Sequence, residues 1–485
     1  MLTPLLRAEL GAMLRLAWPV VVSQVGLMFM GVVDTIMLGH YGADELAAVA
    51  AANVLATGVM LVVPLGVLGG MDPVISQAWG AGHHAAAGRT LRRGLVLAAV
   101  LSVPLMIGVA LTAQILGAVG QPAHLLPHVA NYSLWLIPGC FPVLAFGALR
   151  NTMTAVGDVR PILWVTLSAN LVNAGGNALF IFGSFGMPAM GVAGAGLATT
   201  LARIYMVLAL YVIARHHGTL QRIRPTAPWQ LWEWRAFRMI LRVGLPIALL
   251  TGLEVGAFGM FTLMAGWLSA STLAGHQITL NMAALMFMMA VGVSAASSVR
   301  VGHAIGRRDE DGARRAAVVA FGLGGVIMLG STLLFALLPG PLASLYTPPG
   351  EVRVIAVRLI PIAAWFQLVD GTQAVAFGVL RGAGDTRAAA LLGLAGFYGL
   401  AVPLAGWLAF CTPLGAVGIW IAIVFGLGFV AILAVARVWW RLHQPLVPLE
   451  AEHGAASVEL PVDSPTLLPV RDRRPNPLAE PGTTV

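Results

Sequence analysis

Residues 19–42 read PVVVSQVGLMFMGVVDTIMLGHYG, an apolar run that contains a single acidic side chain, Asp34. An α-helix rises 1.5 Å per residue, so about 20 such residues cross the hydrocarbon core of a bilayer. A carboxylate at the bilayer centre costs about 2.5–3.5 kcal/mol on insertion scales, and it is retained where it meets a partner, a cavity or an ion. This stretch therefore predicts a membrane-spanning helix that carries a functional acid.

The whole chain has the composition of a polytopic membrane protein. Of its 485 residues, 58% are hydrophobic and 10% are charged, and the mean hydropathy is +0.86. Soluble domains are about a quarter charged. We therefore expect an all-α membrane protein with twelve transmembrane helices. Hydropathy predicts them at residues 16–38, 47–70, 94–115, 131–149, 162–182, 191–213, 243–266, 277–297, 316–337, 355–378, 390–409 and 415–437.

The basic residues predict how the chain lies in the membrane. All 28 are arginine; Arg353 and Arg358 fall on one side and Arg203 falls inside a span, which leaves 25 on the other side. The positive-inside rule then places both termini in the cytoplasm. We expect the protein itself to lie in the inner (plasma) membrane. These juxtamembrane arginines account for the net charge of +8 without a nucleic-acid partner. A chain without lysine has no Walker A motif, and two cysteines, Cys140 and Cys411, predict neither a disulfide framework nor a metal site.

An internal repeat divides the chain into two halves of six spans at an offset of 227 residues. The matched residues are Arg15 and Pro19 with Arg242 and Pro246, and Gly157, Asp158 and Arg160 with Gly384, Asp385 and Arg387. Halves with an even number of spans share one topology and form two bundles around a central cavity. We predict an N-terminal six-helix bundle at 1–213, a cytoplasmic linker at 214–241, a C-terminal six-helix bundle at 242–441 and a disordered cytoplasmic tail at 442–485.

Three acids in predicted spans do not follow this repeat. The residues matched at the offset are Phe261 for Asp34, Leu27 for Glu254 and Val143 for Asp370. Structural residues tend to follow the symmetry of a repeat, so these acids indicate function. Counted at 1.5 Å per residue from the flanking arginines, Glu254 and Asp370 both lie about 18 Å into the membrane. They are candidates for one shared site that couples Na⁺ or H⁺, whereas Asp34 is predicted in the outer third of its span.

Asn173 and Asn177 are the candidate partners of Asp34. Their i,i+4 spacing places both on one face of a predicted helix, where amides prefer a polar partner to lipid. Arg203 is a possible counter-charge for any of the three acids.

Candidate substrate contacts come from an aromatic residue and a group of methionines. Phe366 lies one turn before Asp370, and a ring beside a carboxylate can bind a cation. Met260, Met282 and Met286 belong to a flexible thioether cluster that suits varied ligands. For all four residues, core packing or lipid contact is the competing interpretation.

Several stretches together resemble the MATE (multidrug and toxin extrusion) family, in its bacterial NorM-like branch, over about residues 10–440. They are residues 19–42 quoted above, LVNAGGNALF (171–180), GLPIALLTGLEVGAF (244–258) and LVDGTQAVAFGVLRGAGDTR (368–387). The paired signatures GALRNTMTAVGDVRP (147–161) and GVLRGAGDTR (378–387) resemble the cytoplasmic turns of the family. The residue that matches Phe366 is often Tyr in the family, so Phe366 keeps the ring but lacks the hydroxyl.

The resemblance implies a V-shaped pair of bundles that exports amphipathic, often cationic drugs in exchange for inward Na⁺ or H⁺. It assigns Glu254 and Asp370 to a cation site that could hold Na⁺, and Asp34, Asn173 and Asn177 to a polar site in the N-terminal half. We expect no cofactor, small-molecule substrates, contact with membrane lipids and a monomer.

Two other functions compete with multidrug export. A lipid-linked oligosaccharide flippase of the same superfamily would need a basic cleft, whereas the charges within these spans are mainly acidic. A polytopic membrane enzyme would need a cluster of nucleophile, base or metal ligands near one interface, and the sequence has no HExxH motif. We therefore expect a transporter rather than an enzyme.

Overall fold

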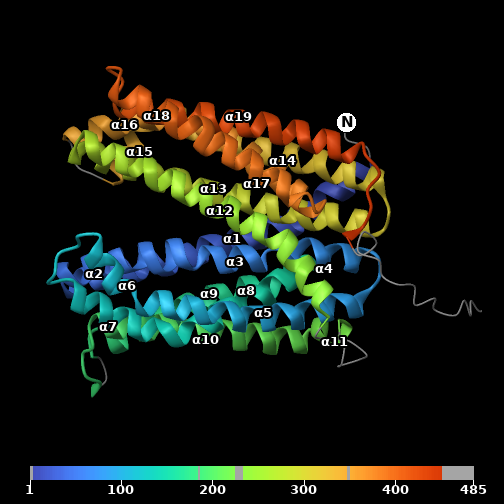
Figure 1. Ribbon diagram of the computed structural model, residues 1–485, viewed down its shortest axis with the longest axis horizontal. Helices are drawn as coiled ribbons and strands as arrows, with labels where there is room; N and C mark the ends of the chain where they lie inside the picture. Colours follow the sequence, from blue (N-terminus) through green and yellow to red (C-terminus); the bar gives the residue numbers. More distant parts are fainter. Residues whose placement is uncertain (1–3, 184–185, 224–232, 347–349, 450–485) are drawn as a thin grey trace, which may run out of the picture.

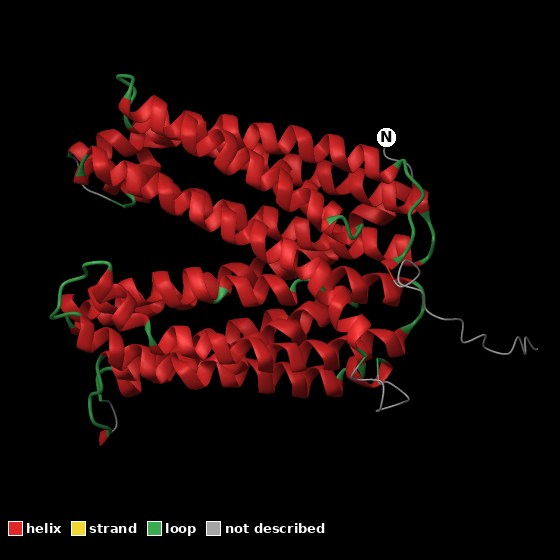
Figure 2. Ribbon diagram, in the orientation of Figure 1, coloured by secondary structure: helices red, strands yellow, loops and turns green. Residues whose placement is uncertain are grey.

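The computed structural model describes residues 4–183, 186–223, 233–346 and 350–449. Within these ranges every regular element is a helix (Figure 2). This confirms the predicted all-α fold. Residues 224–232 of the predicted linker and residues 450–485 of the predicted tail lie outside the described residues.

The first bundle contains the helices before the linker. They are α1 (Pro4–Tyr41), α2 (Ala43–Asn53), α3 (Val62–Leu68), α4 (Met71–Gly80), α5 (His84–Ala110), α6 (Thr112–Ala118), α7 (Leu126–Leu136), α8 (Cys140–Ala155), α9 (Arg160–Phe180), α10 (Val192–His216) and α11 (Thr219–Arg222). A π-helical segment, η1 (Val54–Met60), joins α2 to α3, and a short 3-10 turn, η2 (Ile137–Gly139), joins α7 to α8.

The second bundle contains the helices after the linker. They are α12 (Trp234–Leu268), α13 (Ala270–Gly306), α14 (Glu310–Leu337), α15 (Pro339–Ser344), α16 (Glu351–Gly382), α17 (Thr386–Leu394), α18 (Val402–Phe410) and α19 (Ala416–Leu442), with a π-helical segment, η5 (Ala395–Ala401), between α17 and α18. The helix α12 begins at Trp234, so the connection between the bundles is shorter than the predicted linker.

Eleven helices among the described residues are long and apolar enough to span a membrane. The helix missing from that set is α9, which packs between α1 and α10. Its asparagines, Asn170, Asn173 and Asn177, make it less apolar than its neighbours. With α9 the described helices correspond to the twelve predicted spans.

The two bundles form a V (Figure 1). They diverge toward the end that carries α2, α6, α7, α15 and α18, and they meet at the end where α4 and the N-terminal part of α1 lie. The helix ends at the closed end of the V carry most of the arginines, as the predicted arginine asymmetry requires.

Glycines let the two bundles approach closely where they meet. A methyl group placed on Gly70, just before α4, would collide with the Ile240 carbonyl oxygen, and one on Gly306 of α13 would collide with that of Gln77. A larger residue there would push the backbones apart, which is why small residues suit such helix crossings. Arg300 of α13 adds a two-pronged ion pair to Glu9 of α1, at 2.7 and 2.6 Å.

The backbone carries the repeat that the sequence indicates. Gly191 and Gly415 precede α10 and α19 with nearly the same conformation, φ 54° and ψ −125° against φ 52° and ψ −123°. Gly157 and Gly384, in the matched turns, also have positive φ angles of 86° and 77°. Residues other than glycine adopt this region at a cost, so the glycines preserve equivalent turns in both halves.

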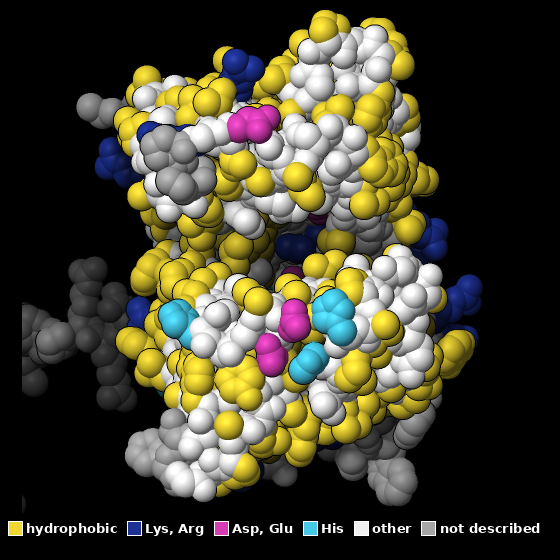
Figure 3. Space-filling model, turned by 90° about the vertical axis from the view of Figure 1, so that its left-hand side faces the viewer, with side chains coloured by type: hydrophobic (Ala, Val, Ile, Leu, Met, Phe, Trp, Pro, Cys, Tyr) yellow, Lys and Arg dark blue, Asp and Glu magenta, His cyan; other side chains and the backbone are white. Residues whose placement is uncertain are grey.

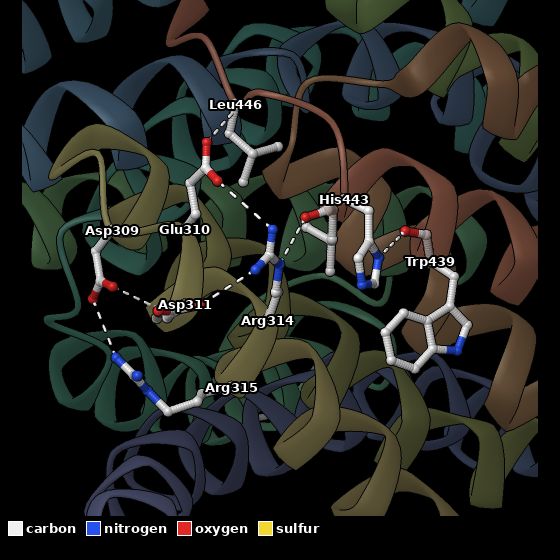
Figure 4. Close-up of polar contacts among 10 residues, drawn as sticks. Asp309, Glu310, Asp311, Arg314, Arg315, Trp439, His443 and Leu446 are labelled. Atoms are coloured by element: carbon white, nitrogen blue, oxygen red, sulfur yellow. Dashed lines mark hydrogen bonds and ion pairs between the residues drawn. The ribbon is translucent and has the colours of Figure 1, made fainter.

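Residues 443–449, which we call the C-terminal strap, follow α19 and cross the closed end of the V. Arg314 Nε of α14 donates to the Leu442 carbonyl oxygen at 2.9 Å, and the Leu446 amide donates to Glu310 Oε1 at 3.3 Å. Figure 4 shows Leu446 beside Glu310. Leu449 is buried with Val74 of the first bundle and Val243 of the second. The predicted tail thus begins as a packed segment that contacts both bundles.

We predict that Leu449 holds the strap in place. Burying a leucine side chain is worth about 1.5–3 kcal/mol, and the Leu449 amide also donates to Gln77 Oε1 at 2.9 Å. In Leu449→Ser, a spin label at position 444 should become more mobile, as read from its electron paramagnetic resonance line shape. Val447→Ser is the control, because Val447 is 45% exposed. Equal spectra for the two variants would show that Leu449 does not anchor the strap.

Candidate functional site

Asp34 lies inside the first bundle, seven residues before the end of α1. Its side chain is buried, with 5% of the residue exposed. Asn177 Nδ2 of α9 donates to Asp34 Oδ1, so the predicted contact between these two residues is present. Thr199 Oγ1 of α10 lies 3.4 Å from Asp34 Oδ2 and 2.9 Å from the Ala195 carbonyl oxygen. Three helices therefore converge on this carboxyl group.

Asn173 stands one turn before Asn177 and is also fully buried. It lies close enough to the Asp34 carboxyl group for a side-chain hydrogen bond to influence it, although neither its amide oxygen nor its amide nitrogen has a partner of good hydrogen-bond geometry among the described residues. The Asn177 amide oxygen is likewise without a donor. Buried polar atoms without a protein partner are where water, a proton or an ion binds.

Polar residues that the sequence analysis missed extend this site toward the π-helical segment η1. Tyr132 of α7 is buried beside Asp34 and donates to Asn53 Oδ1 at 3.0 Å. Asn53 ends α2, and π-helical turns such as the following η1 occur often at functional sites. Arg203 of α10 lines a small pocket with Thr57 and acts on Asp34 electrostatically, but it forms no ion pair within the described part of the chain.

Asp370 is the buried acid of the second bundle, with 3% of the residue exposed on α16. Its Oδ1 atom has no hydrogen-bond partner among the described residues, and neither have Oε1 of Gln367 and Oε1 of Gln373. The three residues recur at i,i+3 spacing along α16 and so lie near one another. The interior of this bundle thus holds a row of oxygen atoms that lack donors.

Glu254 lies on α12 and lines a cavity of about 410 Å³ between the two bundles. Figure 3 looks into the open end of the V, where charged side chains are visible at the floor of the cleft. Asp370 does not line this cavity, but Glu254 is close enough for the two carboxyl groups to interact electrostatically. The two acids therefore lie at neighbouring positions, one facing the cleft and one inside the bundle.

The predicted substrate contacts do not reach this cavity. Phe366 is buried and packs edge-on against Trp420 and Phe258, with ring centroids 5.8 and 6.1 Å apart. Met282 is buried, and Met286 packs against the same apolar core. Met260 is also absent from the cavity lining. In this conformation Phe366, Met282 and Met286 serve the packing of the second bundle.

The charged residues at the cavity floor are not among the functional residues predicted from the sequence. Asp72 of α4, Arg150 of α8 and Arg381 of α16 line the cavity together with Glu254. Arg381 Nε lies 3.9 Å from Asp72 Oδ2, a contact that crosses from one bundle to the other. Arg150 Nη1 donates to Gln24 Oε1 at 3.1 Å. The opposite charges of these residues compensate one another, which lowers the free-energy cost of burying them.

The described residues contain no group of three or more His, Cys, Asp or Glu side chains that could hold a metal ion. Any cation bound at Asp34 or Asp370 would therefore use amide or carbonyl oxygens beside one or two carboxylates. Oxygen atoms are the ligands that hard cations prefer.

Comparison with known proteins identifies the family. The MatE family model matches residues 19–179 and 246–407, two segments that begin 227 residues apart. A probable multidrug resistance protein NorM of Bradyrhizobium diazoefficiens is 38% identical over 432 residues, covering 87% of this chain and 92% of that protein. One of the same name from Rhodopseudomonas palustris is 35% identical, covering 90% of this chain and 92% of that protein.

Solved structures share the fold. The eukaryotic MATE transporter AtDTX14 superposes with a TM-score of 0.83 at 22% identity, covering 93% of this chain and 99% of that one. A MATE protein in a bent conformation gives a TM-score of 0.83 at 20% identity, covering 93% and 100%. The family model and the curated relatives place the chain in the MATE (multidrug and toxin extrusion) family, so it is a transporter and not an enzyme.

Proposed function

We propose that this protein exports amphipathic, often cationic small molecules across the plasma membrane, driven by inward movement of Na⁺ or H⁺. The observation that carries the proposal is a buried carboxyl group in each bundle, Asp34 and Asp370, beside oxygen atoms that lack donors. The relatives named multidrug resistance proteins support small-molecule export over the flipping of lipid-linked oligosaccharides.

The arginine asymmetry supports an orientation with both termini in the cytoplasm. The bundles meet at the arginine-rich end and diverge at the other (Figure 1). In that orientation the V opens to the outside, the cavity of about 410 Å³ lies at its floor, and the structure corresponds to the state that releases substrate.

Asp370 is suited to bind the coupling ion. A proton on Asp370 would supply the donor that Gln367 Oε1 or Gln373 Oε1 lacks, and Na⁺ would bind the same oxygens. Either cation removes the penalty of a second negative charge near Glu254, since two close carboxylates in a low dielectric do not both ionise cheaply.

Glu254 links the coupling ion to the substrate. Because it faces the cavity, a cationic substrate bound there would contact its carboxylate and compete with the coupling ion for the shared negative charge. Such competition is a coupling free energy between two sites, and each ligand weakens the other by the same factor. Substrate is exchanged for the ion when the cleft between the two bundles opens alternately to one side of the membrane and to the other.

Asp34 is suited to sense protonation or cation binding in the first bundle. The ionised carboxylate accepts from Asn177 Nδ2 and lies near Thr199, whereas the protonated form would donate to an amide oxygen such as that of Asn177 or Asn173. The ionised and the protonated carboxyl group therefore require different partners on α9. Asp34 lies on α1, which also carries Pro19, and the missing N–H of this proline makes bending of the helix easier.

We predict the orientation as follows. Cysteines introduced at Ala43 and Gly186 should react with a membrane-impermeant maleimide added to intact cells, and one at Arg222 should react only after the membrane is permeabilised. The variants are made without Cys140 and Cys411, whose removal is checked first for retained transport. The reverse labelling pattern would contradict the orientation and the outward-open assignment.

We predict that Glu254→Gln and Asp370→Asn reduce ion-driven export by about tenfold or more, since coupling free energies commonly correspond to factors of about 5–150. The measurement is efflux of a fluorescent organic cation from reconstituted vesicles, under a Na⁺ gradient and then under a pH gradient. Glu351→Gln is the control on α16, because this acid is exposed at the end of the helix. Full export by the double variant would exclude these acids from coupling.

We predict that Asp34→Asn impairs export more than it impairs binding. Asn mimics one charge state permanently and blocks the cycle, so export should fall by about tenfold while the dissociation constant of the substrate changes by less than about threefold. Thr35→Val is the control, because the Thr35 side chain is exposed on α1 and bonds only its own helix. If Asp34→Asn exports like Thr35→Val, Asp34 has a structural role only.

A further inference from the structure

A second cavity, of about 400 Å³, lies at the closed end of the V, away from the acids. We call it the basic pocket and define it by Arg387 of α17, Arg437, Trp440 and Arg441 of α19, and Asp385 before α17. The strap supplies one wall of this pocket through Gln444, Pro445, Val447 and Leu449. The pocket thus lies between the second bundle and a segment that reaches the first.

The charge of the pocket is positive. Asp385 is the one acid in its lining, and it accepts from Arg437 Nε at 2.8 Å. Arg437 also stacks on the Trp440 ring, 4.2 Å from its centroid. Arg441 Nη1 donates to the Pro445 carbonyl oxygen at 3.2 Å, and neither Arg387 nor Arg441 forms an ion pair with a carboxylate of the described chain. Two guanidinium charges in the pocket therefore lack a described counter-ion.

Backbone donors add to the attraction for an anion. The helix α17 begins at Thr386, and the Asp385 side chain does not cap it. The first N–H groups of a helix have no partner within the helix, and they favour anions such as phosphate. Thr386 and Arg387 line the pocket, so these donors lie beside the arginines.

The position of the pocket relative to the membrane indicates the source of the anion. Trp439 and Trp440 are 58% and 52% exposed at the end of α19, one of the described helices that are long and apolar enough to span a membrane. Exposed tryptophans at the end of a span mark the level of the lipid headgroups. Figure 4 shows Trp439 beside His443, where α19 passes into the strap.

We propose that the basic pocket binds the phosphate of an anionic phospholipid headgroup in the adjoining leaflet. Arginine recognises phosphate through paired hydrogen bonds, and basic pockets between helices at this membrane level bind anionic lipids. The bound lipid bridges α17, α19 and the strap. This site is separate from the proposed coupling acids, so its test needs no transport measurement.

The test compares lipid binding by full-length purified protein in native mass spectrometry. Phosphatidylglycerol and phosphatidylcholine are titrated against the wild type, Arg387→Gln/Arg441→Gln, and the control Arg215→Gln/Arg222→Gln. The control arginines are exposed near the same end of the first bundle. We expect the wild type and the control to bind phosphatidylglycerol at least about tenfold more tightly than the pocket variant. Equal affinities for all three proteins would overturn the proposal.

Further measurements distinguish a lipid phosphate from a soluble phosphate, and lost binding from unfolding. Glycerol 3-phosphate and inorganic phosphate at millimolar concentration should not displace the lipid; displacement by either would show a site for soluble phosphate instead. Arg387→Lys/Arg441→Lys keeps the charge but loses the paired geometry, so its affinity should fall between those of the wild type and the glutamine variant. An unchanged melting temperature for the glutamine variant shows that lost binding is not unfolding, and a variant that melts early is replaced by Arg387→Gln alone.

Discussion

A carboxyl group in the interior of a membrane must be protonated, hydrated or paired, because the lipid around it offers no such partner. This requirement explains the polar residues that interrupt otherwise apolar helices of this protein. Asp34 is surrounded by Asn177, Thr199 and Asn173, and Asp370 stands between two glutamines on its own helix. Each group leaves buried oxygen atoms without donors, so each is suited to gain and lose a cation.

The internal repeat produces two similar bundles, and the three acids make the two bundles different. Equivalent glycine turns before α10 and α19 and glycine-mediated contacts between the bundles build two similar halves that meet at one end. None of the three acids has an acidic counterpart in the other half. The two bundles therefore carry different polar sites on a common framework, and the contact between Asp72 and Arg381 ties the halves together beneath the cleft.

Much of the fold followed from hydropathy, because a span must be apolar over about 20 residues. The contact between Asp34 and Asn177 was predictable, since amides one turn apart in an apolar helix need a polar partner. The role of Thr199 was not, because threonine commonly bonds the carbonyl of its own helix, as it does here with Ala195. Hydropathy could not decide between substrate contact and core packing for Phe366, since an apolar ring suits either role. The change of composition at residue 442 likewise concealed the buried Leu446 and Leu449 of the strap.

If the buried acids exchange a cation for the substrate, substrate binding must release that cation. An organic cation is added to purified protein in weakly buffered solution, while an indicator dye follows H⁺ and a selective electrode follows Na⁺. Wild-type protein should release one of these ions in proportion to bound substrate, and Glu254→Gln/Asp370→Asn should release none. Saturating substrate binding to the wild type without release of either ion would contradict it.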